Sequence, residues 1–171
     1  MINVVLYEPE IPQNTGNIMR TCAGTGTKLH LIEPLGFRLD EKSIKRSGVN
    51  YIDHCDYIVY SSYEEFLDKN QGTFYYLSRY GKKTHSSANY SDKDEPIYLF
   101  FGKESTGIPR EILKKNIDHC MRIPMNNKIR ALNLSNSVAI VLYEVLRQQD
   151  YNDLLRAEPF KGEDFLTKKI K

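Results

Sequence analysis

The sequence has no tryptophan, only three cysteines in 171 residues, and no long apolar run. Cys22, Cys55 and Cys120 lie far apart, which argues against a disulfide framework and a zinc site, since both use closely spaced pairs. The longest strongly apolar run, residues 138–143, is about a third of a bilayer span, and no basic segment precedes an apolar stretch at the start. We expect a cytoplasmic protein with reduced cysteines, no metal and no membrane partner.

An excess of charge of one sign is also lacking, because 24 basic residues oppose 22 acidic ones for a net +2. So small a net charge excludes a globally polycationic nucleic-acid binder, and any nucleic-acid site must be a local patch. Ten glycines and seven prolines are too few for a low-complexity chain, and 40% apolar residues suffice for a core. The length fits one α/β-sized domain.

Short apolar runs alternate with patterned stretches along the whole chain. Strands are predicted at 2–6, 29–32, 57–60, 73–78, 97–101 and 121–123. Helices are predicted at 16–23, 40–46, 64–68, 109–115 and 135–149, with residues 80–95 as a loop. Asn14 or Thr15 is available to cap the first helix, and Pro109 to begin the fourth. Near-continuous apolar strands separated by helices predict a parallel sheet covered on both faces.

Ligands bind such sheets where loops leave the carboxyl ends of the strands. The first of these loops carries Asn14, Asn17 and Arg20 at three-residue spacing, which places Asn17 and Arg20 along one side of a helix next to its N-terminus. The N–H groups of a helix N-terminus suit a phosphate or a developing oxyanion. The alternative is a capped helix with a surface arginine.

Two further loops carry more polar or flexible residues than a turn requires. In residues 101–109, Gly102 and Gly107 lie on either side of Glu104, which permits close backbone approach to a ligand and equally an ordinary turn. This loop lacks the Lys-Ser/Thr pair of a phosphate-binding loop, so ATP is poorly supported. In residues 123–136, Asn133 and Ser135 can cap the helix that follows.

Together these loops resemble the three signature motifs of the SPOUT class of S-adenosylmethionine-dependent RNA methyltransferases. Residues 14–20 match the first motif, 101–107 the second and 133–136 the third. The match is closest to the branch that methylates ribose 2′-hydroxyls, and within it to small enzymes acting on the wobble cytidine or uridine of tRNA. The resemblance spans residues 1–149, and we expect a domain at 1–155 with a basic C-terminal tail at 156–171.

The resemblance implies a single-domain α/β fold, a parallel sheet flanked by helices with a deep trefoil knot in its C-terminal third. It implies a homodimer whose site combines both protomers, S-adenosylmethionine as methyl donor, S-adenosylhomocysteine as product, and no metal. Cofactor contacts are implied at Leu77, Gly102, Gly107, Ile123, Ala131 and Leu132. Relatives usually have serine at position 131, so only a contact made through the backbone amide is retained by Ala131.

The implied reaction transfers a methyl group from a sulfonium to the ribose 2′-hydroxyl of nucleotide 34 of tRNA, with leucine tRNAs as the expected substrates. Because a guanidinium keeps its proton, Arg20 is expected to stabilise the forming alkoxide and pair with the target phosphate. The other implied catalytic residues are Asn14, Asn17, Glu104, Asn133 and Ser135. Contacts with the anticodon stem-loop are expected at Arg46, Lys128, Arg130 and Tyr143.

Three other functions stay open on the sequence. The same basic loops suit a non-catalytic tRNA-binding module, and the strand pattern also suits a phosphate- or flavin-binding flavodoxin-like protein. A third alternative is a methyltransferase of the same class that acts on another RNA ribose. His30 lies within an apolar strand and is expected to be a core residue.

Overall fold

The computed structural model describes residues 1–39, 54–162 and 164–168 and contains one seven-stranded sheet in the order β3-β2-β1-β6-β4-β7-β5. All of its strand pairs are parallel, as predicted. The strands are β1 (Ile2–Tyr7), β2 (Lys28–Ile32), β3 (Tyr57–Tyr60), β4 (Thr73–Leu77), β5 (Lys83–Thr84), β6 (Ile97–Phe101) and β7 (Cys120–Arg122). The trefoil knot stays a prediction.

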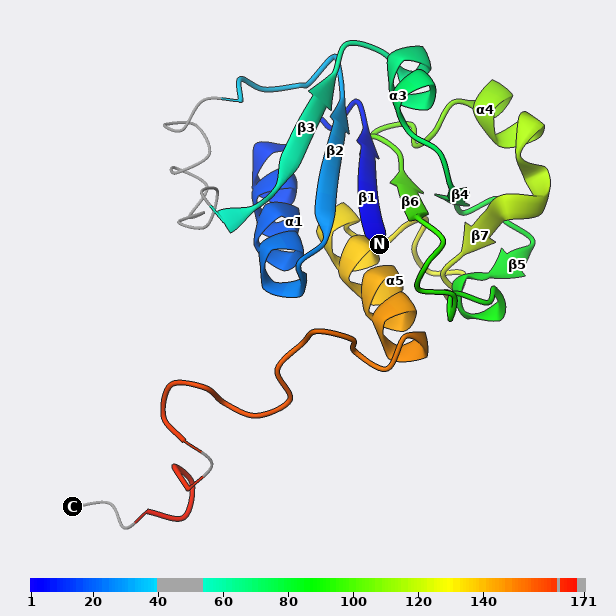
Figure 1. Ribbon diagram of the computed structural model, residues 1–171. Helices are drawn as coiled ribbons and strands as arrows, with labels where there is room; N and C mark the ends of the chain where they lie inside the picture. The colour runs from blue at the N-terminus through cyan, green and yellow to red at the C-terminus, as the bar shows by residue number, and fades with distance from the viewer. Residues whose placement is uncertain (40–53, 163, 169–171) are drawn as a thin grey trace.

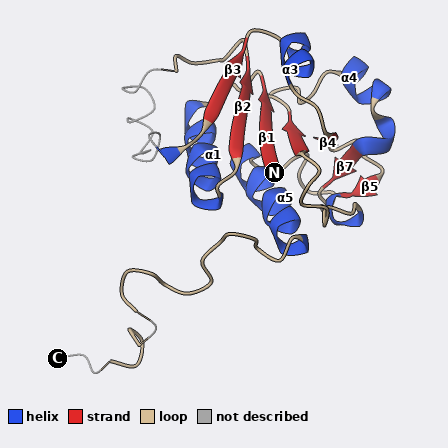
Figure 2. Cartoon of the chain, viewed as in Figure 1, coloured by secondary structure: helices blue, strands red, loops and turns tan. Residues whose placement is uncertain are grey.

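Helices cover both faces of this sheet, as Figures 1 and 2 show. The long helices α1 (Pro12–Thr25) and α5 (Leu134–Gln148) pack on one face, and the short helices α3 (Tyr63–Lys69) and α4 (Arg110–Lys115) pack on the other. Successive side chains of a strand point to opposite faces. Val4 of β1 therefore joins the core under α1 and α5, whereas Val5 joins the aromatic core under α3.

The predicted bounds of β3 and β6 are confirmed, but three predictions need correction. Helix α1 begins at Pro12, and Ile11 precedes it without a side-chain cap, so Asn14 and Thr15 lie inside the first turn and cap nothing. Pro109 is the residue before α4 and not its first residue. The expected loop at 80–95 contains β5 and the 3₁₀ helix η2 (His85–Ser87). The helix expected at 40–46 lies outside the described residues.

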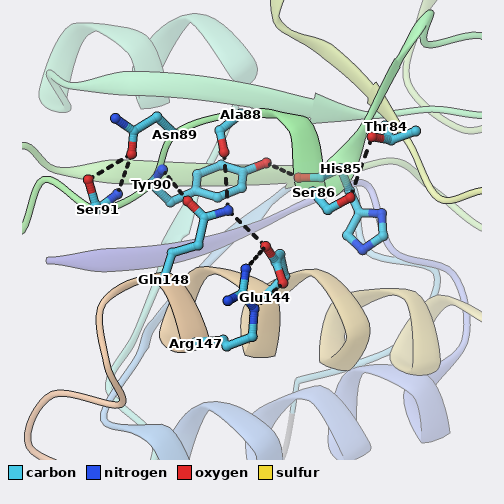
Figure 3. Close-up of polar contacts among 10 residues, drawn as sticks. All are labelled: Thr84, His85, Ser86, Ala88, Asn89, Tyr90, Ser91, Glu144, Arg147 and Gln148. Carbon is cyan, nitrogen blue, oxygen red and sulfur yellow. Dashed lines mark hydrogen bonds and ion pairs between the residues drawn. The ribbon is translucent and has the colours of Figure 1, made fainter.

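The segment that follows β5 is fastened to α5 by the side chain of Gln148 (Figure 3). Its amide oxygen accepts from the backbone N–H of Tyr90 at 2.8 Å, and its nitrogen donates to the Ala88 carbonyl at 3.1 Å and to Glu144 at 2.8 Å. Arg147 forms two 2.9 Å bonds with the same carboxylate, which lower the pKa of Glu144 to about 2. This segment is therefore an ordered part of the domain.

His30 is a core residue, as expected. Its Nδ1 lies 2.9 Å from the Tyr60 hydroxyl and its Nε2 lies 3.0 Å from Oδ1 of Asn3. Burial lowers the pKa of its imidazole to about 4, because a charged ring would lose its hydration there. The histidine is therefore neutral at physiological pH and serves packing.

After α5 the chain leaves the sheet (Figure 1). Tyr151 and Leu154 still contact the core, whereas Leu155 and Phe160 are 78% and 92% exposed. The boundary between domain and tail near residue 155 stays a prediction. In the described ranges no helix is both long and apolar enough to traverse a bilayer.

Candidate functional site

The four strands in the middle of the sheet end side by side at one edge. In the strand register Phe101 of β6 is the partner of Leu6 in β1 and of Leu77 in β4, and Leu77 is also the partner of Met121 in β7. The segments that follow these strands, residues 8–11, 78–82, 102–109 and 123–133, therefore start next to one another. Of the polar residues singled out in the sequence, Glu104, Lys128, Arg130 and Asn133 lie on these segments, and Asn14 and Ser135 lie in the first turns of the helices that follow two of them.

Glu104 fastens the second loop to the first. One of its carboxylate oxygens accepts from the backbone N–H of Glu10 at 2.8 Å, and the other accepts from the N–H of Ile11 at 3.3 Å and from Nδ2 of Asn14 at 2.9 Å. A carboxylate can accept from several N–H groups at once, and each such bond is stronger than a neutral one. Glu104 therefore holds the second loop against the first.

Asn133 joins the third loop to the same cluster. Its Nδ2 donates to Oδ1 of Asn14 at 3.0 Å, and its Oδ1 accepts from the backbone N–H groups of Ser135 and Asn136 and from the Ser135 hydroxyl. Asn133 is thus the N-cap of α5, as predicted, whereas Ser135 lies inside the helix and does not cap it. Asn14, Glu104 and Asn133 connect all three loops through side-chain hydrogen bonds.

Glu8 and Glu10 reinforce this connection, one through an ion pair and the other through two hydrogen bonds. The sequence did not indicate either contact. Glu8 has a left-handed backbone conformation, with φ of 47°, and its carboxylate lies 2.6 Å from the ammonium group of Lys103. Glu10 accepts from the hydroxyl and the backbone N–H of Ser105, both at 2.8 Å, and these bonds lower the pKa of its carboxyl group. A left-handed conformation is uncommon in residues with a side chain and costs free energy, so surrounding contacts must hold it. The sequence feature that could have indicated these contacts is the pair of acidic residues at positions 8 and 10.

Gly102 is needed because the loop folds back onto it. A Cβ at this position would lie 2.1 Å from the carbonyl carbon of Gly107 and 2.2 Å from the nitrogen of Ile108. Gly107 itself has φ of 76°, a conformation that favours glycine, and its N–H bonds to the Lys103 carbonyl at 2.8 Å. Both glycines are thus required by the loop's own conformation.

The side chains expected near the cofactor form an apolar and peptide-lined rim. Leu77 and Ile123 are half-buried and pack against the core under α1 and α5, and Leu77 ends the strand that lies between those preceding Gly102 and Ile123. Leu132 is half-buried and Ala131 is exposed. Apolar side chains with nearby peptide groups suit a flat heterocycle such as adenine.

Asn17 and Arg20 lie on the outer surface of α1. The exposed residues of this helix form one stripe with helical spacing, namely Gln13, Asn17, Arg20 and Gly24. The predicted position of Arg20 beside the helix N-terminus is wrong, because α1 begins at Pro12 and Arg20 is in its third turn, about 12 Å along the axis. Helix-dipole stabilisation therefore does not act on a group held by Arg20.

Helix α5 carries a matching exposed stripe next to α1. Its members are Asn136, Ile140, Tyr143 and Arg147, of which Ile140 and Tyr143 are 40% and 49% exposed. Lys128 and Arg130 are exposed on the third loop, as their expected role requires, and Arg46 lies outside the described residues. The expected substrate and catalytic residues that are exposed in the described part of the chain are Asn17, Arg20, Lys128, Arg130, Asn133 and Tyr143.

The opposite face has a different character. Between the end of β1, α3 and α4 lies a cavity of about 900 Å³ whose lining includes Glu8, Glu33, Glu64 and Glu111. Lys115 also lines this cavity and Glu8 is paired with Lys103, but the carboxylates outnumber these cations and disfavour an RNA backbone. Within the described ranges, no group of three His, Cys, Asp or Glu side chains is arranged to hold a metal ion.

Comparison with known proteins gives a consistent result over nearly the whole chain. The model of the SpoU rRNA Methylase family matches residues 1–143. A protein of Listeria monocytogenes serotype 4b (strain F2365), provisionally named a tRNA (cytidine(34)-2′-O)-methyltransferase, is 52% identical over 155 residues, which cover 90% of this chain and 92% of the relative. The tRNA (cytidine(34)-2′-O)-methyltransferase of Escherichia coli (strain K12) is 44% identical over 153 residues, covering 88% and 96%.

A solved structure agrees with the fold. The crystal structure of an RNA methyltransferase from Bacillus anthracis, also provisionally named, superposes with a TM-score of 0.88 at 52% identity. The match covers 91% of this chain and 99% of that one, so nearly all of that protein has a counterpart here.

Proposed function

The chain belongs to the SpoU rRNA methylase family, and from this premise we propose that it methylates the ribose 2′-hydroxyl of nucleotide 34 in tRNA. The proposal covers cytidine or uridine at this wobble position, in leucine tRNAs, in the cytoplasm. The relatives named for cytidine 34 of tRNA match this chain over about nine tenths of their own length. Nearly all of each relative therefore has a counterpart in this chain.

The observation that carries the proposal is the hydrogen-bonded connection of the three loops. Asn14 contacts both Glu104 and Asn133, at 2.9 and 3.0 Å. A reaction between a donor and a sugar hydroxyl needs both groups held in alignment, and rigid loops at one edge of a sheet provide that.

Arg20 is the residue that we assign to the reacting oxygen. Its guanidinium stays protonated, so it stabilises the negative charge that develops on the 2′-oxygen and pairs with the adjacent phosphate. Asn17, one turn earlier on the same exposed stripe, orients the arginine or the ribose.

The rim formed by Leu77, Gly102 and Ile123 is where we place S-adenosylmethionine. The apolar side chains would hold the adenine ring, and backbone groups of residues 102–107 and 123–132 would bind its polar atoms. When bound, S-adenosylmethionine supplies a methyl group on a sulfonium that needs no further activation. This rim is distinct from the cavity of about 900 Å³ described above and from one of about 530 Å³ that is lined by Tyr75, Lys83 and His119.

A second copy of the chain completes the site in this proposal. The exposed stripes of α1 and α5 carry Asn17 and Arg20 beside Ile140 and Tyr143, a mixture of apolar and functional side chains on one face. A homodimer through this face would bury the apolar groups and bring Arg20 of one copy toward the loops of the other. Tyr143 would then either pack at that contact or stack on a base.

Nucleoside mass spectrometry of tRNA from a strain that lacks the gene tests the function directly. The 2′-O-methyl group at nucleotide 34 of leucine tRNAs should disappear, and purified protein with S-adenosylmethionine should restore it. The family description names rRNA, so ribosomal RNA from the same strain is measured in parallel. Loss of a methyl group from rRNA alone would replace the tRNA proposal with another RNA ribose, and loss from neither would leave a binding module.

A further inference from the structure

The turn that follows β4 presents an aromatic ring and a guanidinium together at the same edge of the sheet. Gly81 donates to the Ser78 carbonyl at 3.1 Å, so Arg79 and Tyr80 occupy the two central positions of the turn. The guanidinium of Arg79 lies 4.7 Å from the centre of the Tyr80 ring and donates to its hydroxyl. The tyrosine is 69% exposed, so most of the ring is open to a ligand.

This turn is held firmly against β7. The N–H of Ser78 donates to the Met121 carbonyl at 2.9 Å, and the Arg122 guanidinium donates to the Arg79 carbonyl. A Cβ on Gly81 would lie 2.6 Å from the carbonyl carbon of Met121, so the two backbones are in direct contact. Because the turn is already ordered, a partner that binds it loses little conformational entropy.

The surroundings of the turn are basic. Arg79, Lys82 and Lys83 are exposed, Arg122 is half-buried beside them, and residues 79–84 include no acidic residue. Lys83 donates to the backbone carbonyl of Asp118 at 2.9 Å, which places one carboxylate nearby. In a chain with a net charge of only +2, four cations around one turn are a marked local concentration.

We propose that this turn, the Arg79–Tyr80 platform, binds unpaired nucleotides of the RNA substrate. The open face of Tyr80 stacks on a base, and Arg79, Lys82 and Arg122 pair with the flanking phosphates. Unpaired bases in RNA loops stack on aromatic rings and guanidinium planes, which is how single-stranded segments are commonly held. The inference rests on the proposed function for the identity of the RNA, which is the anticodon loop.

The position of the platform fits this role. Leu77 comes directly before the turn and is the register partner of Phe101 and Met121, the residues next to Gly102 and Arg122. The turn therefore begins directly after Leu77, one of the residues of the rim where the methyl donor is placed. A base stacked on Tyr80 would hold its neighbour's ribose close to that rim.

The test measures binding of the full chain to a fluorescent anticodon stem-loop of about 17 nucleotides. Methyl-transfer kinetics and calorimetry with the methyl donor are measured in parallel. Tyr80→Ala should raise the Kd and KM for the RNA about tenfold, while kcat and the affinity for S-adenosylmethionine stay within about twofold. Tyr80→Phe keeps the ring and should bind within about twofold of the unmodified chain. Lys82→Ala should reduce the slope of log Kd against log salt by about one.

Lys93→Ala is the matched control for charge removal. Lys93 precedes β6, and its carbonyl accepts from the N-terminal ammonium group at 3.2 Å, so it lies at the opposite edge of the sheet. This variant should leave RNA binding unchanged. An unchanged Kd for a folded Tyr80→Ala variant overturns the platform, and so does a loss of donor affinity with an unchanged Kd for RNA, which would make Tyr80 a cofactor contact. If no methyl transfer occurs at all, the proposed function fails, and the binding measurement still decides the platform.

Discussion

The side chains of Asn14 and Asn133 are joined by a 3.0 Å hydrogen bond, although 119 positions separate them in the chain. Asn14 accepts this bond with its oxygen and donates with its nitrogen to Glu104 at 2.9 Å. A single amide therefore uses both of its ends to connect the second and third loops. Neither a carboxylate nor a hydroxyl of the same size offers an acceptor and an NH₂ donor in this arrangement.

Asn14→Asp tests whether the connection of the three loops depends on the amide of Asn14. The variant replaces the donated hydrogen bond by a carboxylate facing Glu104, and two like charges at this distance destabilise the loop contact by about 2 kcal/mol. We expect a lower thermal midpoint and a loss of methyl transfer of about tenfold or more. Gln71→Glu makes the same amide-to-acid change at an exposed residue before β4, at the end of the sheet away from the three loops, and should change neither quantity. Wild-type stability and rate in Asn14→Asp would show that the three-loop connection is dispensable.

Arg20→Ala separates chemistry from binding. The side chain is exposed in the third turn of α1, so its removal leaves no cavity and the fold should be unchanged. Donor affinity measured by calorimetry should stay within about twofold, whereas methyl transfer should fall about 10²- to 10³-fold, the usual effect of losing a group that stabilises a developing oxyanion. Arg20→Lys keeps the charge but not the two-pronged geometry and should give an intermediate rate. A tritiated-methyl assay that finds equal rates for Arg20→Ala and wild type would remove the assigned role.

Local patterns predict most of the sheet and only part of the first helix. β6 has its predicted bounds because five apolar residues follow Pro96 without interruption. α1 begins four residues before its predicted start, because Pro12 begins the helix and the side chain of Asn14, a typical cap, is bonded to Glu104 and Asn133 instead. Because these partners are distant in the sequence, the residues next to Asn14 do not indicate them.

The identities of the site residues followed from the resemblance of three motifs, whereas their contacts did not. The partners of Glu104 are 90 to 94 positions away in the chain, and they include two backbone N–H groups that carry no sequence signal. They meet because β6 inserts between β1 and β4, which is a property of strand order and not of any single segment. The Arg79–Tyr80 turn likewise lies at the junction between the strand predicted at 73–78 and the loop predicted at 80–95, where no local pattern indicated it.

Gly102→Ala should disable the second loop. Its Cβ would overlap the backbone at Gly107 and Ile108, so the loop must move away from the rim proposed for the donor. We expect calorimetry to show at least a tenfold loss of affinity for S-adenosylmethionine. Gly24→Ala, in the last turn of α1, meets nothing within 4 Å and should raise stability by about 0.5–1 kcal/mol without affecting the donor. Equal affinities in the two variants would mean that the loop is not part of the donor site.

His30 should make the fold sensitive to mild acid. The pKa of the buried imidazole is lowered from 6.5 to about 4, so above pH 6.5 the ring is neutral in the folded and unfolded states alike. As the pH falls from 6.5 to 4, the imidazole of His30 becomes protonated in the unfolded chain but stays neutral in the folded chain. The free energy of unfolding therefore decreases by up to about 3 kcal/mol. Urea unfolding of wild type and His30→Asn at several pH values isolates this contribution. The variant should be less stable at pH 7 and lose less stability on acidification, and parallel profiles would contradict the account.

Gln148→Ala should reduce stability without reducing activity. The change leaves the N–H of Tyr90 and the carbonyl of Ala88 without their partner in the interior, which costs about 2–3 kcal/mol. Gln148 is the last residue of α5, about 20 Å along the helix from the Asn133 cap, so the three connected loops are unaffected. Arg147→Ala removes an ion pair whose arginine side chain is 59% exposed and should cost less than about 1 kcal/mol. Thermal unfolding and methyl-transfer rates measured on both variants distinguish the two outcomes, because a rate that fell with stability in Gln148→Ala would mean that the segment after β5 also supports the site.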